Sequence, residues 1–77
     1  METSYTKTEQ EFLIKLGAKI RQLRTNIGLS QEKLSFECNL DRTYVGSVER
    51  GERNISVINL KKIATALNIN PSELLEF

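Results

Sequence analysis

Histidine and tryptophan are absent from the sequence, and cysteine and proline occur only once each. Without histidine the chain lacks the commonest general base of enzymes, and Cys38 has no imidazole partner that would activate it as a nucleophile. The four glycines are scattered and form no loop that would hold phosphate groups. The sequence therefore argues against an enzyme, and neither a metal site nor a cofactor is expected.

The single cysteine also excludes a disulfide within the chain, which favours a reducing compartment. We expect Cys38 to be a small, buried, apolar side chain. No apolar run approaches the roughly 20 residues of a membrane-spanning helix, and the start METSYTKTEQE lacks the layout of a secretory signal. These features predict a cytoplasmic protein without a membrane partner.

The composition is that of one small folded domain. The chain has 77 residues, of which 39% are hydrophobic and 27% are charged, and such values are typical of a folded protein rather than a disordered one. A core of this size is close to marginal, so domains of this length often gain stability by self-association.

Charge is unevenly distributed along the chain, although the net charge is only +1. Residues 15–54 hold eight Lys/Arg against five Asp/Glu, an excess of +3, whereas residues 1–14 have a balance of −2 and residues 55–77 are neutral. A local basic excess is expected of a surface that faces phosphate, but it is also common on ordinary solvated faces.

Apolar residues recur at helical spacing throughout, which predicts an all-α fold of five short helices. The first helix is expected to begin at Thr8, with Glu11 completing a capping box, and to end at Gly28. Residues 1–7 would then be a flexible arm, and residues 8–77 a single domain. The buried stripe expected on this helix comprises Leu13, Leu16, Ile20, Leu23 and Ile27.

Residues 30–50 predict two short helices joined by a tight turn. Ser30 is placed to cap the helix QEKLSFE, and Asp41 to cap a second helix that Gly51 ends. Asn39 in the intervening CNL suits a left-handed conformation. Such a pair is a helix-turn-helix, whose second helix presents its outer face to base edges in the DNA major groove.

Two further helices are expected after this pair. Ser56 would cap the fourth, whose apolar residues are Val57, Leu60, Ile63, Ala64 and Leu67. The fifth opens with Asn70 as cap, Pro71 at the first helical position and Glu73 at the third, a strong start signal.

The second helix of the pair carries polar residues that packing alone does not explain. If Val45 and Val48 are buried, the opposite side of the helix is expected to be exposed. Near the helix start, this side holds Arg42, Thr43, Gly46 and Ser47. Arginine can bond guanine O6 and N7 together, threonine offers a hydroxyl and a methyl, and serine a short hydroxyl. Gly46 either allows close approach to DNA or is a tolerated surface glycine. Tyr44 either bonds a phosphate or lies half-buried across the helix pair.

The string GLSQEKLSFECNLDRTYVGSVERGERNIS resembles the lambda-repressor-like helix-turn-helix domain of phage-repressor-like regulators (XRE or Cro/CI type). More narrowly, LDRTYVGSVERGERN is similar to the controller proteins of bacterial restriction–modification systems, and the resemblance covers residues 12–75. It implies a sequence-specific regulator that represses or activates transcription from a near-palindromic operator on double-stranded DNA.

Two other readings stay open at this stage, a phage-type repressor and an antitoxin-like protein-interaction module. A protein-binding face would be expected to show exposed aromatic or aliphatic anchors, whereas the outer face of residues 42–53 is expected to be polar and basic. An antitoxin usually carries an additional segment that wraps its toxin, for which this chain has no evident room. DNA binding is therefore the favoured interpretation.

The resemblance implies roles for individual residues. Arg42 and Thr43 match base-reading positions, and Arg24 with Glu49 matches a structural ion pair between the first and third helices. The residues expected to contact the DNA backbone or groove are Gln31, Tyr44, Arg53, Asn54 and Asn59. Gln31 stands at a helix N-terminus, which is a natural site for anions.

The resemblance also implies a homodimer formed through the helices near 56–77, with two recognition helices one DNA turn, roughly 34 Å, apart. The apolar residues at the end of the chain that suit this interface, or that cover the chain's own core instead, are Leu74, Leu75 and Phe77. On the second helix, Glu32 and Glu37 either contact RNA polymerase or are ordinary solvated carboxylates.

Overall fold

Helices make up most of the computed structural model, which describes residues 4–77. The elements in chain order are α1 (Lys7–Asn26), α2 (Gln31–Cys38), α3 (Arg42–Glu49), α4 (Val57–Ala66) and the 3-10 helix η1 (Pro71–Leu75). The predicted all-α fold is confirmed, with the fifth helix present as a short 3-10 helix. No helix among the described residues has the length and hydropathy that a bilayer crossing requires.

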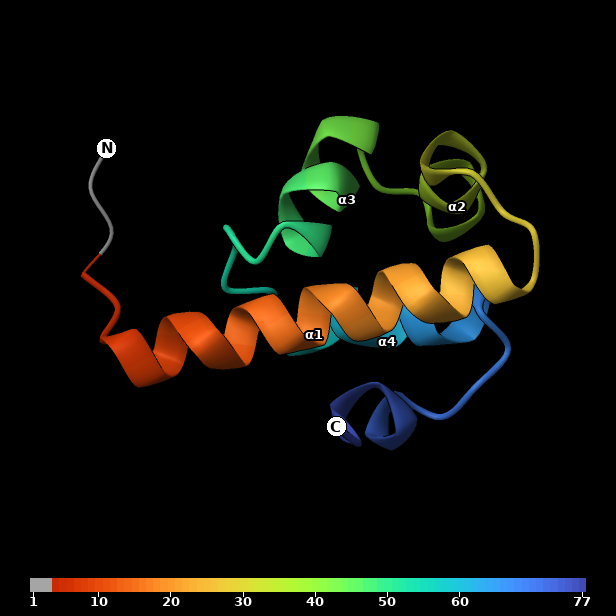
Figure 1. Ribbon diagram of the computed structural model, residues 1–77. Helices are drawn as coiled ribbons and strands as arrows, with labels where there is room; N and C mark the ends of the chain where they lie inside the picture. Colours follow the sequence, from red (N-terminus) through yellow and green to blue (C-terminus); the bar gives the residue numbers. More distant parts are fainter. Residues whose placement is uncertain (1–3) are drawn as a thin grey trace.

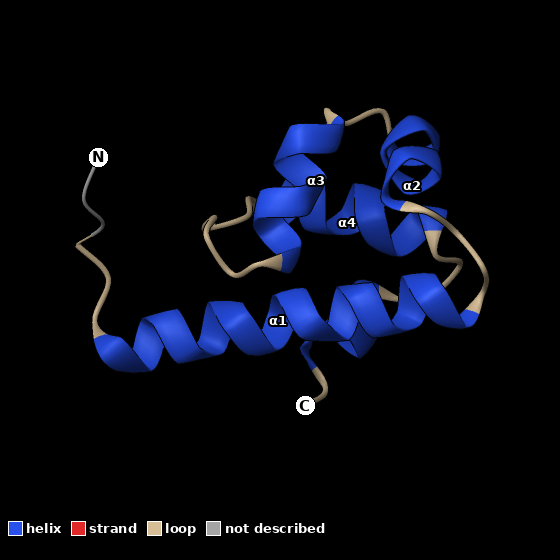
Figure 2. Ribbon diagram, turned by 45° about the horizontal axis from the view of Figure 1, so that its top comes forward, coloured by secondary structure: helices blue, strands red, loops and turns tan. Residues whose placement is uncertain are grey.

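The longest helix, α1, runs across the whole molecule, with α2 and α3 on one side of it and η1 on the other (Figure 1). It contacts both α3 and η1, while α2 contacts α3 and α4. The N-terminal half of α1 extends beyond the other helices, as the turned view also shows (Figure 2). The helix-turn-helix pair, α2 and α3, therefore rests on a scaffold made by α1 and α4.

One apolar core lies between these helices. Its side chains come from every element, and they are Leu16, Ile20, Leu34, Cys38, Val45, Val48, Ile63, Ala64, Leu67 and Leu74. Complete burial of one such aliphatic side chain contributes about 1.5–3 kcal/mol. Cys38 is 5% exposed, so its predicted place as a small buried side chain is confirmed, and this burial raises the pKa of its thiol.

Most predicted helix ends are confirmed. The side chains of Ser30, Asp41 and Ser56 each accept a hydrogen bond from a backbone N–H in the first turn of α2, α3 and α4, respectively. Residues with positive φ follow the first three helices at the predicted places, namely Gly28, Asn39 and Gly51. At the last helix, the Asn70 N–H donates to the Glu73 carboxylate at 2.8 Å, as a capping box requires.

The start of α1 differs from the prediction. Thr6 is the cap: its hydroxyl accepts from the Glu9 N–H at 3.1 Å, and the Glu9 carboxylate accepts from the Thr6 N–H at 2.9 Å. The predicted box of Thr8 and Glu11 is wrong, because the same Thr-x-x-Glu pattern occurs two residues earlier and its use lengthens the helix by further backbone bonds. Lys7 is thus helical rather than part of an arm, and residues 1–3 of the predicted arm lie outside the described residues.

The predicted apolar stripes are correct except at helix ends. Leu13, Leu16 and Ile20 are buried, whereas Ile27 is 54% and Val57 80% exposed. Ile27 is the residue after α1 and Val57 is the first residue of α4. Both lie where the chain turns away from the core. A pattern of apolar residues at helical spacing therefore overestimates burial at the ends of a helix.

A glycine on α1 allows that helix to lie directly against the end of α3. A Cβ added at Gly17 would overlap the backbone carbonyl oxygens of Val48 and Glu49. No other residue type fits this contact without moving one of the two helices. This close approach places the end of α3 within reach of side chains on the next turns of α1.

The ion pair expected between α1 and α3 is present in the structure. Arg24 Nε donates to Glu49 Oε2 at 2.7 Å, and Arg24 Nη2 donates to Glu49 Oε1 at 3.0 Å. The third guanidinium nitrogen, Nη1, donates to the Leu29 carbonyl oxygen at 2.8 Å. The two side chains are only 9% and 2% exposed, so a charge-assisted, two-bond contact between desolvated groups fixes α3 relative to α1.

Loss of one partner of this pair should destabilise the fold strongly. In Arg24→Met the Glu49 carboxylate stays buried without its counter-charge, so we expect the free energy of unfolding to fall by about 3–5 kcal/mol. Urea titration followed by circular dichroism measures this change. The double variant Arg24→Met/Glu49→Leu should recover part of the loss, because no charge is then left buried.

The exposed pair of Arg50 and Glu52 supplies the control, since both side chains are more than half exposed. Arg50→Gln should leave the urea midpoint nearly unchanged because water screens a surface pair. An equally small effect for Arg24→Met would show that other contacts, and not this ion pair, hold α3 in place.

Candidate nucleic-acid interface

The first turn of α3 presents the two side chains predicted to read bases. Arg42 and Thr43 are both exposed. The Asp41 carboxylate accepts from the Thr43 N–H at 2.7 Å, so the backbone of this turn is fixed by its cap. A rigid helix start with an exposed guanidinium and hydroxyl has the form that direct readout in a major groove requires.

The next turn of α3 is not exposed as predicted. Ser47 is 6% exposed, and its hydroxyl donates to the Tyr44 carbonyl oxygen at 2.7 Å. Gly46 is also buried, because side chains of Gln31 and Arg50 lie over it. The expected exposure of Gly46 and Ser47 is wrong because α1 and α2 both pack against α3, which leaves only a narrow edge of the helix uncovered.

Gln31, the first residue of α2, joins the site to the buried ion pair. Its Nε2 donates to Glu49 Oε1 at 3.0 Å, and its side chain is half-buried. Glu49 therefore orients the Gln31 amide as well as Arg24. An amide nitrogen carries two hydrogens, so this bond leaves the second N–H of Gln31 for a ligand. That geometry agrees with the phosphate contact predicted for Gln31.

Tyr44, Arg53 and Asn59 form one cluster at the edge of α3. Asn59 Nδ2 donates to Tyr44 Oη at 3.2 Å, and the Arg53 guanidinium carbon lies 5.1 Å from the centre of the Tyr44 ring. Tyr44 is half-buried and packs against the core, and its hydroxyl oxygen meets Asn59 in the first turn of α4. Its phenol hydrogen stays available as a donor, because the bond from Asn59 uses only an oxygen lone pair.

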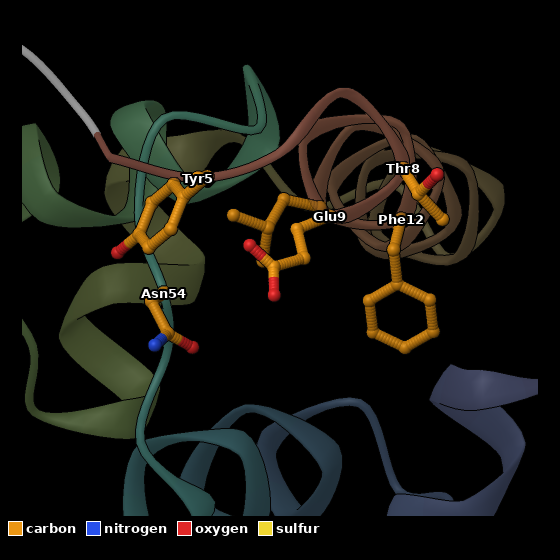
Figure 3. Close-up of a pocket in the computed structure, with 6 residues that line it drawn as sticks. Tyr5, Thr8, Glu9, Phe12 and Asn54 are labelled. Atoms are coloured by element: carbon orange, nitrogen blue, oxygen red, sulfur yellow. The ribbon is translucent and has the colours of Figure 1, made fainter.

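Asn54, the remaining predicted contact, lines a different feature. It borders a hollow whose other lining residues are Tyr5, Thr8, Glu9, Phe12 and Leu13. In the close-up, Asn54 on the loop after α3 lies near Tyr5, which precedes the cap of α1 (Figure 3). The structure therefore places Asn54 beside the N-terminal part of α1.

Arg50 is a basic residue of this region that was not predicted to belong to the site. Its guanidinium makes two hydrogen bonds to the Glu52 carboxylate, at 3.0 and 3.2 Å. This contact raises the pKa of Arg50 and holds the pKa of Glu52 below its usual range. The sequence could have indicated that Arg50 belongs to this site, because residues 42, 46 and 50 are spaced by four and lie along one edge of a helix.

The carboxylates expected to reach RNA polymerase lie on α2. Glu32 and Glu37 are both exposed, and Phe36 between them is 79% exposed. The Lys33 ammonium lies 6.0 Å from the centre of the Phe36 ring. This surface combines an aromatic ring with acidic groups on both sides of it in the sequence.

The apolar residues at the end of the chain divide between the core and the surface. Leu74 is fully buried, whereas Leu75 is 45% and Phe77 50% exposed. Placing Leu74 in a dimer surface is wrong, because η1 packs against both α1 and α4 and Leu74 joins the core between them. The Phe77 ring lies 5.3 Å from the ring of Phe12 on α1, centre to centre.

Comparison with known proteins identifies the family of the chain. The profile of a helix-turn-helix family matches residues 20–74. The control protein C.BamHI of Bacillus amyloliquefaciens is 52% identical over 62 residues, which are 79% of this chain and 76% of that protein.

Two solved controller structures share the fold. The restriction-modification controller protein C.AhdI from Aeromonas hydrophila superposes with a TM-score of 0.80 at 60% identity, covering 80% of this chain and 94% of that one. The controller C.Esp1396I, solved as a tetramer in complex with its natural 35 base-pair operator, has a TM-score of 0.77 at 34% identity and covers 84% of this chain and 86% of that one. The chain therefore belongs to the helix-turn-helix family of transcriptional regulators, among the restriction–modification controller proteins.

Proposed function

We propose that this controller acts in the cytoplasm as a homodimer that binds a near-palindromic operator, with the start of α3 in the major groove. The observation that carries this proposal is the exposed pair Arg42 and Thr43 on a capped turn, in the segment of the chain that holds its basic excess. Arg42 would bond a guanine in each half-site, and Thr43 would contact a neighbouring base by its hydroxyl or methyl group.

Contacts to phosphate would position the helix without reading sequence. Gln31 suits this role because Glu49 already holds its amide, so little side-chain freedom is lost on binding. Tyr44 suits it because Asn59 holds its phenol oxygen and Arg53 covers its ring. Arg53 and Asn54 lie in the loop between α3 and α4 and would meet the DNA backbone or groove beside α3.

Replacement of Arg42 and of Gln31 should separate base reading from phosphate contact. Arg42→Ala should weaken operator binding by about 1–3 kcal/mol and relax the preference at one base pair per half-site. Gln31→Ala should weaken binding to all sequences alike. Fluorescence anisotropy over a salt series measures both, with DNA from directly upstream of the gene for this protein and a random duplex of equal length.

Arg21→Ala, which removes an exposed cation on α1, is the control for net charge. We expect the unmodified protein to prefer the upstream duplex by about 10³-fold or more. Equal, weak binding to both duplexes would contradict a sequence-specific regulator and favour a protein-interaction module. If Arg42→Ala lowered the affinity for both duplexes by the same factor, base reading by Arg42 would be wrong, but the proposed regulator function would stand.

The dimer is proposed to form through residues 56–77, where Leu75 and Phe77 leave apolar surface exposed. Leu75→Glu should shift the protein from dimer to monomer in sedimentation velocity at micromolar concentrations, because a charge would be buried in the contact. Operator affinity should fall with it. Ile27→Glu, at an exposed apolar residue after α1, is the control and should stay dimeric. If Leu75→Glu also stayed dimeric, this interface would be excluded.

Activation is proposed to involve Glu32 and Glu37 on α2, which would face polymerase when the dimer lies beside a promoter. Glu37→Ala should lose activation in a reporter assay while its DNA affinity stays unchanged. Glu11→Ala removes the same charge from an exposed site on α1 and should keep activation. Full activation in Glu37→Ala would show that these carboxylates are only solvated.

A further inference from the structure

The Arg50 side chain lies along the edge of α3 that the proposed function turns towards DNA. It belongs to the row of residues 42, 46 and 50, which are neighbours on one side of the helix. Arg50 Nη1 lies 3.3 Å from the position that a Cβ of Gly46 would occupy, and Gln31 Oε1 lies 3.5 Å from it. The guanidinium therefore folds back into the space left by Gly46, beside the proposed phosphate ligand Gln31.

The backbone after α3 holds Glu52 against this guanidinium. The Glu52 N–H donates to the Ser47 carbonyl oxygen at 2.9 Å, which returns the chain towards the helix. Gly51, the residue before Glu52, has a φ of +77°, and a Cβ at this position would overlap the backbone of Ile14 on α1. The backbone position of Glu52 is thus set by packing. Its side chain lies within reach of Arg50 and accepts two hydrogen bonds from it, at 3.0 and 3.2 Å.

An exposed ion pair of this kind exchanges readily for a stronger one. Arg50 and Glu52 are 59% and 57% exposed in their side chains, so water screens their attraction. A DNA phosphate offers two oxygens in the same geometry, and arginine binds such groups with both arms. The duplex also carries many neighbouring charges that the carboxylate lacks.

We propose that Arg50 is a further contact to the DNA backbone and that Glu52 competes with phosphate for its guanidinium. The inference rests on the proposed function, because it assumes that this edge of α3 faces DNA. The competition lowers the affinity for every sequence, since phosphate carries no base identity. Glu52 thereby raises the protein concentration at which any DNA site fills.

A double-mutant cycle on Arg50 and Glu52 tests this competition. Glu52→Gln removes the charge but keeps the shape, and we expect it to tighten binding about threefold to tenfold on both the upstream and the random duplex. Arg50→Gln should weaken binding and reduce the salt slope by about 1. In the Arg50→Gln background, Glu52→Gln should change affinity by less than about twofold, because the group it competes for is gone.

Two outcomes overturn the inference. An equal gain from Glu52→Gln with and without Arg50 would mean that the carboxylate repels DNA as a general charge. A gain of the same size from Glu11→Gln, an exposed carboxylate on α1, would mean the same. The urea midpoint of each variant is measured alongside to show that the fold is intact.

The same titrations distinguish this inference from the proposed function. If the unmodified protein shows no preference for the upstream duplex, the proposed function fails, while the cycle can still be evaluated on the random duplex because a phosphate contact needs no particular sequence. If the preference is present and the cycle shows no coupling between Arg50 and Glu52, the further inference alone is wrong.

Discussion

The geometry of the helix-turn-helix pair, α2 and α3, depends on one carboxylate, that of Glu49. It accepts two hydrogen bonds from Arg24 and one from Gln31, and Arg24 also bonds the carbonyl oxygen of Leu29. A charge placed in the interior is costly unless its hydrogen-bonding capacity is used, and here it is used by groups from α1 and α2. The Glu49 carboxylate consequently sets both the orientation of α3 and the direction of the Gln31 amide, the proposed ligand of a phosphate.

The chain contains a second arginine–carboxylate pair with the same two-bond chemistry and a different environment. Glu49 has almost no exposed side-chain surface, whereas the carboxylate of Glu52 is more than half exposed. Burial makes the first pair a permanent part of the fold, because groups of the chain itself use the hydrogen bonds of both partners and little water reaches them. Exposure makes the second pair exchangeable, so Arg50 stays available to an external anion. Solvent access, rather than the identity of the two groups, separates the structural role of the first pair from the binding role proposed for Arg50.

Short-range features were predictable from the sequence, and several features that depend on packing were not. The left-handed turn at Asn39 was predicted because its cause lies within a few residues. The prediction of Thr8 as cap failed because Thr6 begins the same local pattern two residues earlier. Ser47 was placed on the exposed side because helical spacing identifies one buried face only, and Leu74 was assigned to a dimer surface by the resemblance, with the chain's own core as the alternative. Their burial comes from a second neighbouring helix in each case, which no local pattern records.

The chain's one thiol has a consequence for how motion in this fold can be followed. Cys38 ends α2, is 5% exposed and belongs to the core that α2 shares with α4. Burial also raises the pKa of the thiol, so its reactive thiolate is rare at neutral pH. A thiol reagent can modify Cys38 only when its surroundings open. The labelling rate therefore reports how readily the core around the end of α2 opens, with the natural sequence serving as its own probe.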